Sequence, residues 1–266
     1  MKKYKNIITL SKNSRGCYIL DTIKGCSGCN NVRPLGCYDN CYAKNIADRY
    51  GFDFTNITKR NFTHDNEQIY ILDFYDNKHE NLILQNIKNI NMPFIRIGEM
   101  GDPSENWEHT INVCKIISKA NKPIVIITKH LKSIPQKILS IIDKLNICIN
   151  TSISALDNDN EIKYRLKQYD VLKHHCKSIL RIVSCDFNKH NTEGHKRAKT
   201  QDELFKNDFI IDTIFRPRLN NKLVLNNIIK IRKIKFLKST IIASVFNENT
   251  YFGFCDNCPD MCGIRY

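Results

Sequence analysis

The sequence predicts an α/β protein, specifically a partial (β/α)6 TIM-like barrel with a cysteine-rich C-terminal extension. Two observations predict this fold. From about residue 93 onward, short β-branched apolar runs alternate with charged amphipathic stretches, as in successive βα units around a parallel sheet. The apolar runs recur at intervals of roughly 25 to 30 residues, which is the length that one βα unit needs. We therefore expect the strands to pair in parallel.

Six apolar segments are predicted strands. They are residues 17–21 (CYILD), 93–98 (PFIRIG), 123–128 (PIVIIT), 147–153 (ICINTSI), 179–184 (ILRIVS) and 209–215 (FIIDTIF). Six βα units fall short of the eight that close a barrel, so the predicted barrel is partial.

Five amphipathic stretches are predicted helices that cover the outside of this barrel. They span residues 42–50, 107–120, 132–145, 160–176 and 192–206. Pro103-Ser104 and Ser133-Ile134-Pro135 are start signals for the second and third of them. We expect residues 51–91 to form an irregular insertion that carries some helix.

The chain is expected to form one main domain with an attachment. A length of 266 residues with 42% apolar side chains is enough to bury a core. Residues 1–241 are assigned to the barrel, and residues 242–266 to a cysteine-rich, metal-binding tail. No internal repeat beyond the βα period and no Gly/Ser linker divides the chain further.

Cysteine usage and composition predict a cytoplasmic metal-binding protein. Residues 1–20 carry no export signal, and no apolar run approaches the roughly 20 residues of a membrane span. In a reducing cytosol, close-set cysteines are metal or redox ligands more often than disulfides. A disulfide-stapled secreted protein would need the missing signal. The formal charge of +14 is compatible with a nucleic-acid partner, although the basic residues are scattered.

The first cysteine cluster lies in residues 25–43, GCSGCNNVRPLGCYDNCYA, with the spacing Cys26-x2-Cys29-x7-Cys37-x3-Cys41. Such thiolates suit zinc or an iron–sulfur cluster, and spacing alone does not separate the two. The cluster follows a predicted strand and precedes a predicted helix, at the sheet edge where such folds place active sites. This position favours catalysis over the alternative, a structural zinc knuckle.

The stretch GCYDNCYA, together with the segment 96–102 (RIGEMGD), resembles the radical S-adenosylmethionine (SAM) superfamily over residues 17–220 or so. It is most similar to phage-encoded relatives with a GCxxxCYA-type cluster loop. The resemblance implies a [4Fe–4S] cluster held by three cysteines, with one iron open to SAM. Cys29, Cys37 and Cys41 are the expected ligands. The usual spacing is Cys-x3-Cys-x2-Cys, so Cys26 is an alternative to Cys29 or belongs to a second site.

The same resemblance implies a set of SAM contacts on the rim of the barrel. Segment 98–100 matches a Gly-Gly-Glu motif that receives the SAM amino group, and the strand ends that follow carry hydroxyls and cations. The residues expected to contact the cofactor are Tyr42, Gly98, Glu99, Met100, Thr128, Lys129, Ser152, Ser154 and Arg181, with Arg216 as an alternative carboxylate anchor. The structural alternatives are an ordinary βα turn at residues 98–104 and Ser/Thr N-caps at the strand ends.

The activity implied is reductive cleavage of SAM to methionine and a 5′-deoxyadenosyl radical, which takes hydrogen from a substrate that the sequence does not reveal. Such an enzyme draws electrons from a protein such as flavodoxin or ferredoxin. Two other classes stay open. They are a zinc-binding, nucleic-acid-binding protein without catalysis and an electron carrier that uses no SAM.

The tail carries a second cluster, Cys255-x2-Cys258-x3-Cys262, whose sulfurs are close enough in sequence to share one metal. An auxiliary iron–sulfur cluster is the first interpretation, and a structural zinc that fixes the tail is the alternative. A fourth ligand must come from elsewhere, and Cys17, Cys26 and Cys185 are the candidates. Cys114, Cys148 and Cys176 are expected to be small buried hydrophobes, and the eight histidines to lie on the surface.

Overall fold

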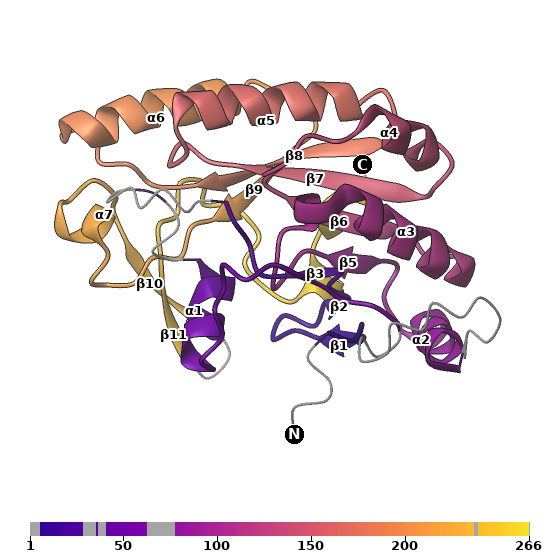
Figure 1. Ribbon diagram of the computed structural model, residues 1–266. Helices are drawn as coiled ribbons and strands as arrows, with labels where there is room; N and C mark the ends of the chain where they lie inside the picture. The colour runs from indigo at the N-terminus through magenta and orange to yellow at the C-terminus, as the bar shows by residue number, and fades with distance from the viewer. Residues whose placement is uncertain (1–5, 29–35, 37–40, 63–77, 237–238, 266) are drawn as a thin grey trace.

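A mostly parallel sheet forms the centre of the molecule in the computed structural model (Figure 1). The structure describes residues 6–28, 36, 41–62, 78–236 and 239–265. In this part of the chain the main sheet has seven strands in the order β1-β2-β5-β6-β7-β8-β9. All neighbours from β2 onward pair in parallel, and β1 pairs with β2 antiparallel at the edge. The predicted α/β class and parallel pairing are therefore confirmed.

The observed strands lie inside or close to the predicted segments. Their bounds are β1 Ser11–Lys12, β2 Tyr18–Ile19, β5 Ile95–Ile97, β6 Ile124–Thr128, β7 Ile147–Ile153, β8 Lys177–Ser184 and β9 Ile210–Ile214. Strands β2 and β5 are shorter than the predicted segments 17–21 and 93–98, while β7 matches its predicted segment residue for residue. A second, two-stranded sheet pairs β3 (Ile23–Lys24) with β4 (Thr58–Lys59) and was not predicted.

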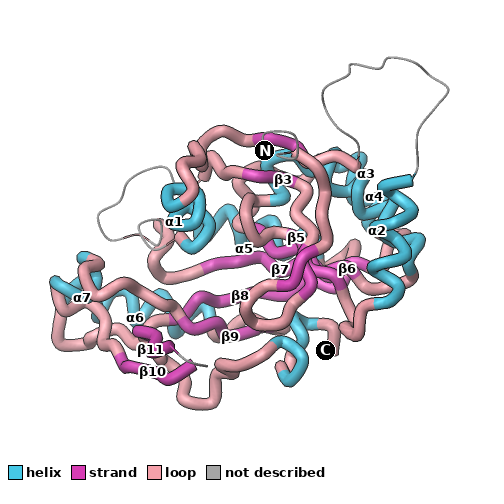
Figure 2. Tube along the Cα trace, turned by 90° about the horizontal axis from the view of Figure 1, so that it is seen from below, coloured by secondary structure: helices cyan, strands magenta, loops and turns pink. Residues whose placement is uncertain are grey.

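Helices α3 to α6 lie on one side of the sheet, where α5 and α6 run above β7 to β9 (Figure 1). The helices and their bounds are α1 Tyr42–Arg49, α2 Lys78–Asn89, α3 Trp107–Ile117, α4 Gln136–Ile142, α5 Asp159–Leu172, α6 Thr192–Leu204 and α7 Lys222–Leu225. Figure 2 shows α2, α3 and α4 together at one end of the sheet and α7 with the hairpin β10–β11 at the other. None of the helices in the described residues is long and apolar enough to cross a membrane.

Local signals set where these helices begin. Asn158 and Glu161 form a capping box at the start of α5. Pro103 opens the short 3-10 turn η2 (Pro103–Asn106), and Asn106 then caps α3. The helix expected at 132–145 is shorter, because Pro135 is its N-cap and residues before a proline are disfavoured in helical conformation.

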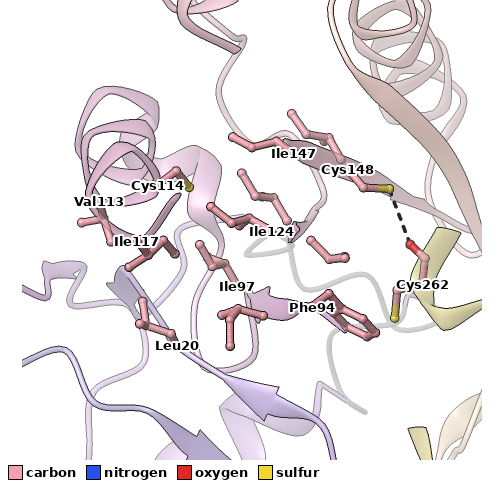
Figure 3. Packing of buried hydrophobic residues seen from close by; sticks show 14 of the residues in the cluster. Leu20, Phe94, Ile97, Val113, Cys114, Ile117, Ile124, Ile147, Cys148 and Cys262 are labelled. Atoms are coloured by element: carbon pink, nitrogen blue, oxygen red, sulfur yellow. Dashed lines mark hydrogen bonds between the residues drawn. The ribbon is translucent and has the colours of Figure 1, made fainter. Parts of the chain in front are cut away.

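The two faces of the sheet have different surroundings. The face toward the helices is aliphatic, with Ile97 and Ile124 against Cys114 and Ile117 of α3 (Figure 3). The opposite, inner face carries the alternate residues, including Arg96 on β5, the run Cys148, Asn150 and Ser152 on β7, and Arg181 on β8. Polar side chains buried on this inner face need partners, and Arg96 pairs with Glu99 while Asn150 donates to the Cys262 carbonyl.

The C-terminal tail covers part of this inner face. After the hairpin β10 (Arg232–Phe236) and β11 (Ser239–Ala243), the chain forms two short 3-10 turns, η4 (Cys255–Asn257) and η5 (Met261–Gly263). The η5 turn contacts β7 and β8. Asn150 Nδ2 donates to the Cys262 carbonyl at 2.9 Å, and the Cys148 thiol donates to the same oxygen at 3.6 Å (Figure 3). The tail is thus integrated into the main core.

Candidate functional site

A cleft of about 780 Å3 opens at the carboxyl ends of the parallel strands. Most of the residues predicted from the sequence to form a cofactor site line it. These are Cys26, Cys41, Tyr42, Gly98, Glu99, Thr128, Lys129, Ser152 and Ser154. They come from parts of the chain more than a hundred residues apart, and the parallel sheet brings them together because the carboxyl ends of its strands share one edge.

Hydrogen bonds from Gly25, Cys26 and Ser27 fix the start of the cysteine-rich loop to the rest of the site. The Gly25 N–H donates to the Met100 carbonyl at 3.2 Å, and the Cys26 N–H donates to the Phe54 carbonyl at 2.9 Å. The Ser27 hydroxyl donates to Glu105 Oε1 at 2.6 Å. These bonds hold the Cys26 side chain at the cleft.

The turn that follows β5 is shaped by a buried carboxylate. Asp21 Oδ1 accepts the backbone N–H groups of Gly98 and Glu99 at 3.2 and 2.8 Å, and Oδ2 accepts that of Met100 at 3.0 Å. Burial raises the pKa of Asp21, while Arg60 and the N–H donors oppose the rise. The N–H groups of the turn face Asp21. The groups of the turn that a ligand could contact are therefore hydrogen-bond acceptors, namely its carbonyl oxygens and the Glu99 carboxylate.

Two glycines let the turn after β5 lie close to neighbouring backbone. Gly98 has φ 101°, and a Cβ there would lie 2.3 Å from the Ile127 carbonyl oxygen. A Cβ on Gly101 would lie 2.4 Å from the Ile23 carbonyl oxygen and 2.8 Å from that of Gly25. Only glycine fits at these contacts. The cysteine loop and the turn after β5 are therefore packed backbone to backbone.

Glu99, expected to receive an ammonium group, already has partners. Its carboxylate forms an ion pair with Arg96 and accepts a long hydrogen bond of 3.5 Å from Asn13 Nδ2. A cationic ligand at this position would therefore share Glu99 with Arg96. Met100 does not line the cleft; it packs with Cys26 and Cys41 on the apolar cluster beneath it.

The polar groups after β6 and β7 are engaged in a buried network. Asp102 accepts the Thr128 hydroxyl at 2.6 Å and the Lys129 N–H at 2.7 Å. The Lys129 ammonium pairs with Asp157 at 3.0 Å. Burial alone would raise the pKa of Asp157, but Lys129 and a second cation, Arg165, outweigh it and lower the pKa. Thr128 and Lys129 thus shape the cleft wall as well as line it.

Hydroxyls and cations complete the lining. The Ser154 hydroxyl donates to the Val183 carbonyl at 2.7 Å, as expected for a residue that shapes a strand end. Ser152 lines the cleft from the inner face of β7, and three cations line it as well: Arg49, Arg216 and Arg218. The formal charge of these arginines makes this part of the wall suitable for an anionic group.

The described cysteines of the cleft suit a metal ligand role. Cys26 and Cys41 both line the cleft, and Cys41 is the N-cap of α1, where a helix terminus favours negative charge. Burial raises the pKa of the Cys26 thiol, and Asp102 and Glu105 add to the rise, so ionisation there needs a compensating cation. Cys29 and Cys37 lie outside the described residues.

The tail cysteines surround a separate, smaller cavity of about 40 Å3. Cys255, Cys258 and Cys262 line it. Arg181, predicted as a cofactor contact, lines this cavity and not the cleft, with its guanidinium 3.9 Å from the Cys262 sulfur. Arg216 lines both hollows.

No three side chains of His, Cys, Asp or Glu among the described residues are placed so that they could hold a metal ion as they stand. Cys17 is buried in the same cluster as the tail residue Cys255. The Cys17 thiol lowers the pKa of Cys255, against the effect of burial and together with Arg15, Arg96 and Arg181.

Some residues that shape the site were not predicted from the sequence, because they belong to no recognisable motif. Asp21 ends the predicted strand 17–21, and its place at a strand end is a signal that could have identified it. Asp102 was noted only as part of a motif. His130, expected on the surface, is 1% exposed. Its position after β6 gave no sign of burial.

Comparison of the chain with protein-family models and with curated proteins finds no match.

Proposed function

We propose that this protein is a radical SAM enzyme whose cluster and SAM occupy the cleft at the carboxyl ends of the strands. One observation carries the proposal. The cysteine-bearing loop at Gly25 and Cys26 packs directly on the Gly98–Gly101 turn, and both face one cleft of about 780 Å3. The turn belongs to segment 96–102, which contributed to the resemblance, and Gly25 and Cys26 begin the cysteine-rich loop that also contains the GCYDNCYA stretch. A cofactor that touches this loop and the turn needs them adjacent.

The arrangement of the sheet supports the same proposal. The parallel strands β2 and β5 to β9 follow one another in chain order, with α3 to α6 on one side. Sequential parallel order with right-handed crossovers sends every helix to the same face and curves the sheet. A partial (β/α)6 barrel is the architecture that these rules favour, and its active sites lie at the carboxyl end of the strands.

The residues divide into ligands and cofactor contacts. Cys41 and either Cys26 or Cys29 would hold the cluster together with Cys37. The turn after β5 would accept the SAM ammonium through its carbonyl oxygens and Glu99. Ser152 would bond to the ribose or carboxylate. Arg216 is a better carboxylate anchor than Arg181, because Arg216 lines the cleft.

When bound and reduced, such a cluster supplies the electron that cleaves SAM to methionine and a 5′-deoxyadenosyl radical, and the chain must position substrate and exclude water. The apolar cluster of Ala43, Ala47 and Phe54, with Cys26 and Cys41 against it, keeps one wall of the cleft dry. Tyr42 is 51% exposed at the mouth of the cleft, where the substrate would enter.

The test is anaerobic reconstitution with iron and sulfide, reduction with dithionite or a flavodoxin system, and assay of 5′-deoxyadenosine from SAM. We expect iron and SAM cleavage in the wild type and loss of both in Cys41→Ala. Cys176→Ala is the matched control, because Cys176 follows α5 and does not line the cleft. Wild-type protein that binds iron without cleaving SAM would contradict the proposal and favour an electron carrier.

A second candidate function is nucleic-acid binding by a zinc protein without catalysis. It is favoured by the formal charge of +14 and by the three arginines in the cleft. Zinc in place of iron, with salt-sensitive binding of RNA or DNA and no SAM turnover, would establish it instead.

A further inference from the structure

The first β-hairpin and the C-terminal tail are joined by their backbones. The Cys255 N–H donates to the Arg15 carbonyl at 2.7 Å, and Arg15 Nε donates to the Gly253 carbonyl at 2.8 Å. Asn13 Oδ1 in turn accepts the Cys17 N–H at 3.0 Å and fixes the hairpin. As a result, Cys17 and Cys255, which are 238 positions apart in sequence, are buried in one cluster, and the Cys255 thiol raises the pKa of Cys17.

The turn between Cys258 and Cys262 is folded around the Cys258 sulfur. The backbone N–H groups of Asp260 and Met261 both bond to the Cys258 sulfur. Burial raises the pKa of the Cys258 thiol, and these two N–H groups oppose the rise. Met261 and Cys262 have φ of 43° and 55°, a left-handed conformation that costs about 1 kcal/mol or more for each non-glycine residue.

This strained turn is held in place by the inner face of the sheet. Asn150 bonds to the Cys262 carbonyl, and Gly263 is in contact with Ile179. The Cys262 side chain then lines the same cavity as Cys255 and Cys258. Three tail cysteines thus line one small hollow, and Cys17 is buried beside them in the same apolar cluster as Cys255 and Cys262.

The charges around the hollow favour an anionic centre. Arg15, Arg96, Arg181 and Arg216 line it, opposed by the two carboxylates Asp212 and Asp260. A divalent metal with four thiolates carries a net charge of about −2, and a buried charge of this kind needs nearby cations to offset desolvation. Arginine is suited to this role because its charge is permanent.

We propose that Cys17, Cys255, Cys258 and Cys262 bind a single zinc ion that fastens the C-terminal tail to the first hairpin. The cavity of about 40 Å3 has room for an ion but is small for an iron–sulfur cluster. The sulfurs must rotate to converge on the ion, because no three of them stand at metal-binding geometry. None of these four cysteines lines the cleft.

The other candidate fourth ligands are excluded by their positions. Cys26 lines the cleft. Cys185 is fully buried in a different apolar cluster with Phe187 and Phe215, and its backbone bonds to the Gln201 side chain. Among the described candidates, Cys17 alone lies beside the tail cysteines.

The test is the zinc and iron content of anaerobically purified protein, measured by mass spectrometry of the elements. We expect about one zinc per chain in the wild type, its loss in Cys17→Ala and Cys258→Ala, and its retention in Cys176→Ala. Cys41→Ala should keep zinc while losing any iron in the cleft. The tail-zinc proposal and the proposed function can therefore be tested separately. Zinc retained in Cys17→Ala, or iron with sulfide in place of zinc at the tail, would overturn the proposal.

A second measurement needs no variant and so does not depend on how the variants fold. Cobalt(II) bound in place of zinc by the wild-type protein should show the strong d–d and sulfur-to-cobalt bands of a tetrahedral four-thiolate site. Weak bands typical of oxygen and nitrogen ligands, or no cobalt uptake, would contradict the four-cysteine assignment.

Discussion

At the scale of single residues, His130 shows how a buried polar group is accommodated. Its ring lies 5.6 Å from that of Trp107, and Nε2 pairs with the Thr151 hydroxyl at 2.9 Å. Burial, with a contribution from the Arg165 charge, lowers the pKa of His130 to about 3. The imidazole is therefore neutral in the folded protein at neutral pH.

This pKa predicts a loss of stability in acid. Because the unfolded imidazole binds a proton near pH 6.5 and the folded one does not, stability falls as pH drops from 6.5 toward 3. At pH 5 the His130 contribution is about 2 kcal/mol at most. Urea unfolding at pH 7 and pH 5 should show a smaller difference in His130→Gln than in the wild type. His190→Gln, at an exposed histidine, controls for the loss of one imidazole, and equal differences in all three proteins would contradict the prediction.

At the scale of elements, the site depends on how closely two loops pack. The bridge between Gly25 and Gly101 and the Gly25–Met100 hydrogen bond hold the cysteine loop on the turn after β5. Asp21, just after β2, fixes the same turn through three N–H bonds. Strands β2 and β5 are neighbours in the sheet, and so are the loops that follow them.

We predict that Gly101→Ala disrupts this contact. The added Cβ would meet two backbone carbonyl oxygens, so we expect a loss of about 1 to 3 kcal/mol in unfolding free energy and poorer iron incorporation in the cleft. Gly51→Ala is the control, because its Cβ meets nothing within 4 Å and only its positive φ of 67° is strained. Chemical denaturation and iron analysis measure both effects; normal iron loading in Gly101→Ala would show that the contact is not needed.

At the scale of the whole molecule, the tail belongs to the same core as the sheet. Cys255, Met261 and Cys262 are buried with Phe94 and Cys148 in the largest apolar cluster of the described residues. A cysteine-rich end that looks like an attachment in sequence thus fills the inner face. Its unfolding should be coupled to that of the sheet.

We predict that Asn150→Ala weakens the entire fold. The substitution leaves the buried Cys262 carbonyl without the amide donor, which costs about 1 to 3 kcal/mol. We expect one unfolding transition at a lower urea midpoint. Fluorescence and proteolysis of the tail would both monitor this transition. Asn249→Ala, at an exposed position, should leave the midpoint unchanged. Tail cleavage in Asn150→Ala at an unchanged midpoint would instead mean an independent tail.

The sequence by itself determined the α/β class, the parallel pairing and most element positions, since periodicity, β-branching and capping act within a few residues. Most of the site residues that it predicted line the cleft, because strand ends of a parallel sheet share an edge. The segments around β1 to β4 were harder, because these strands are only two residues long and depend on partners elsewhere in the chain.

Only the tertiary structure decided which of these residues meet. Arg181 and Ser152 are cross-strand neighbours, yet Ser152 lines the cleft and Arg181 the tail cavity. From the sequence, Cys17 was one of three candidates for the fourth ligand of the tail metal. The structure favours it, because the first hairpin is hydrogen-bonded to the tail. Such contacts span most of the chain, and local sequence patterns carry no information about them, because they arise from packing the two faces of one sheet.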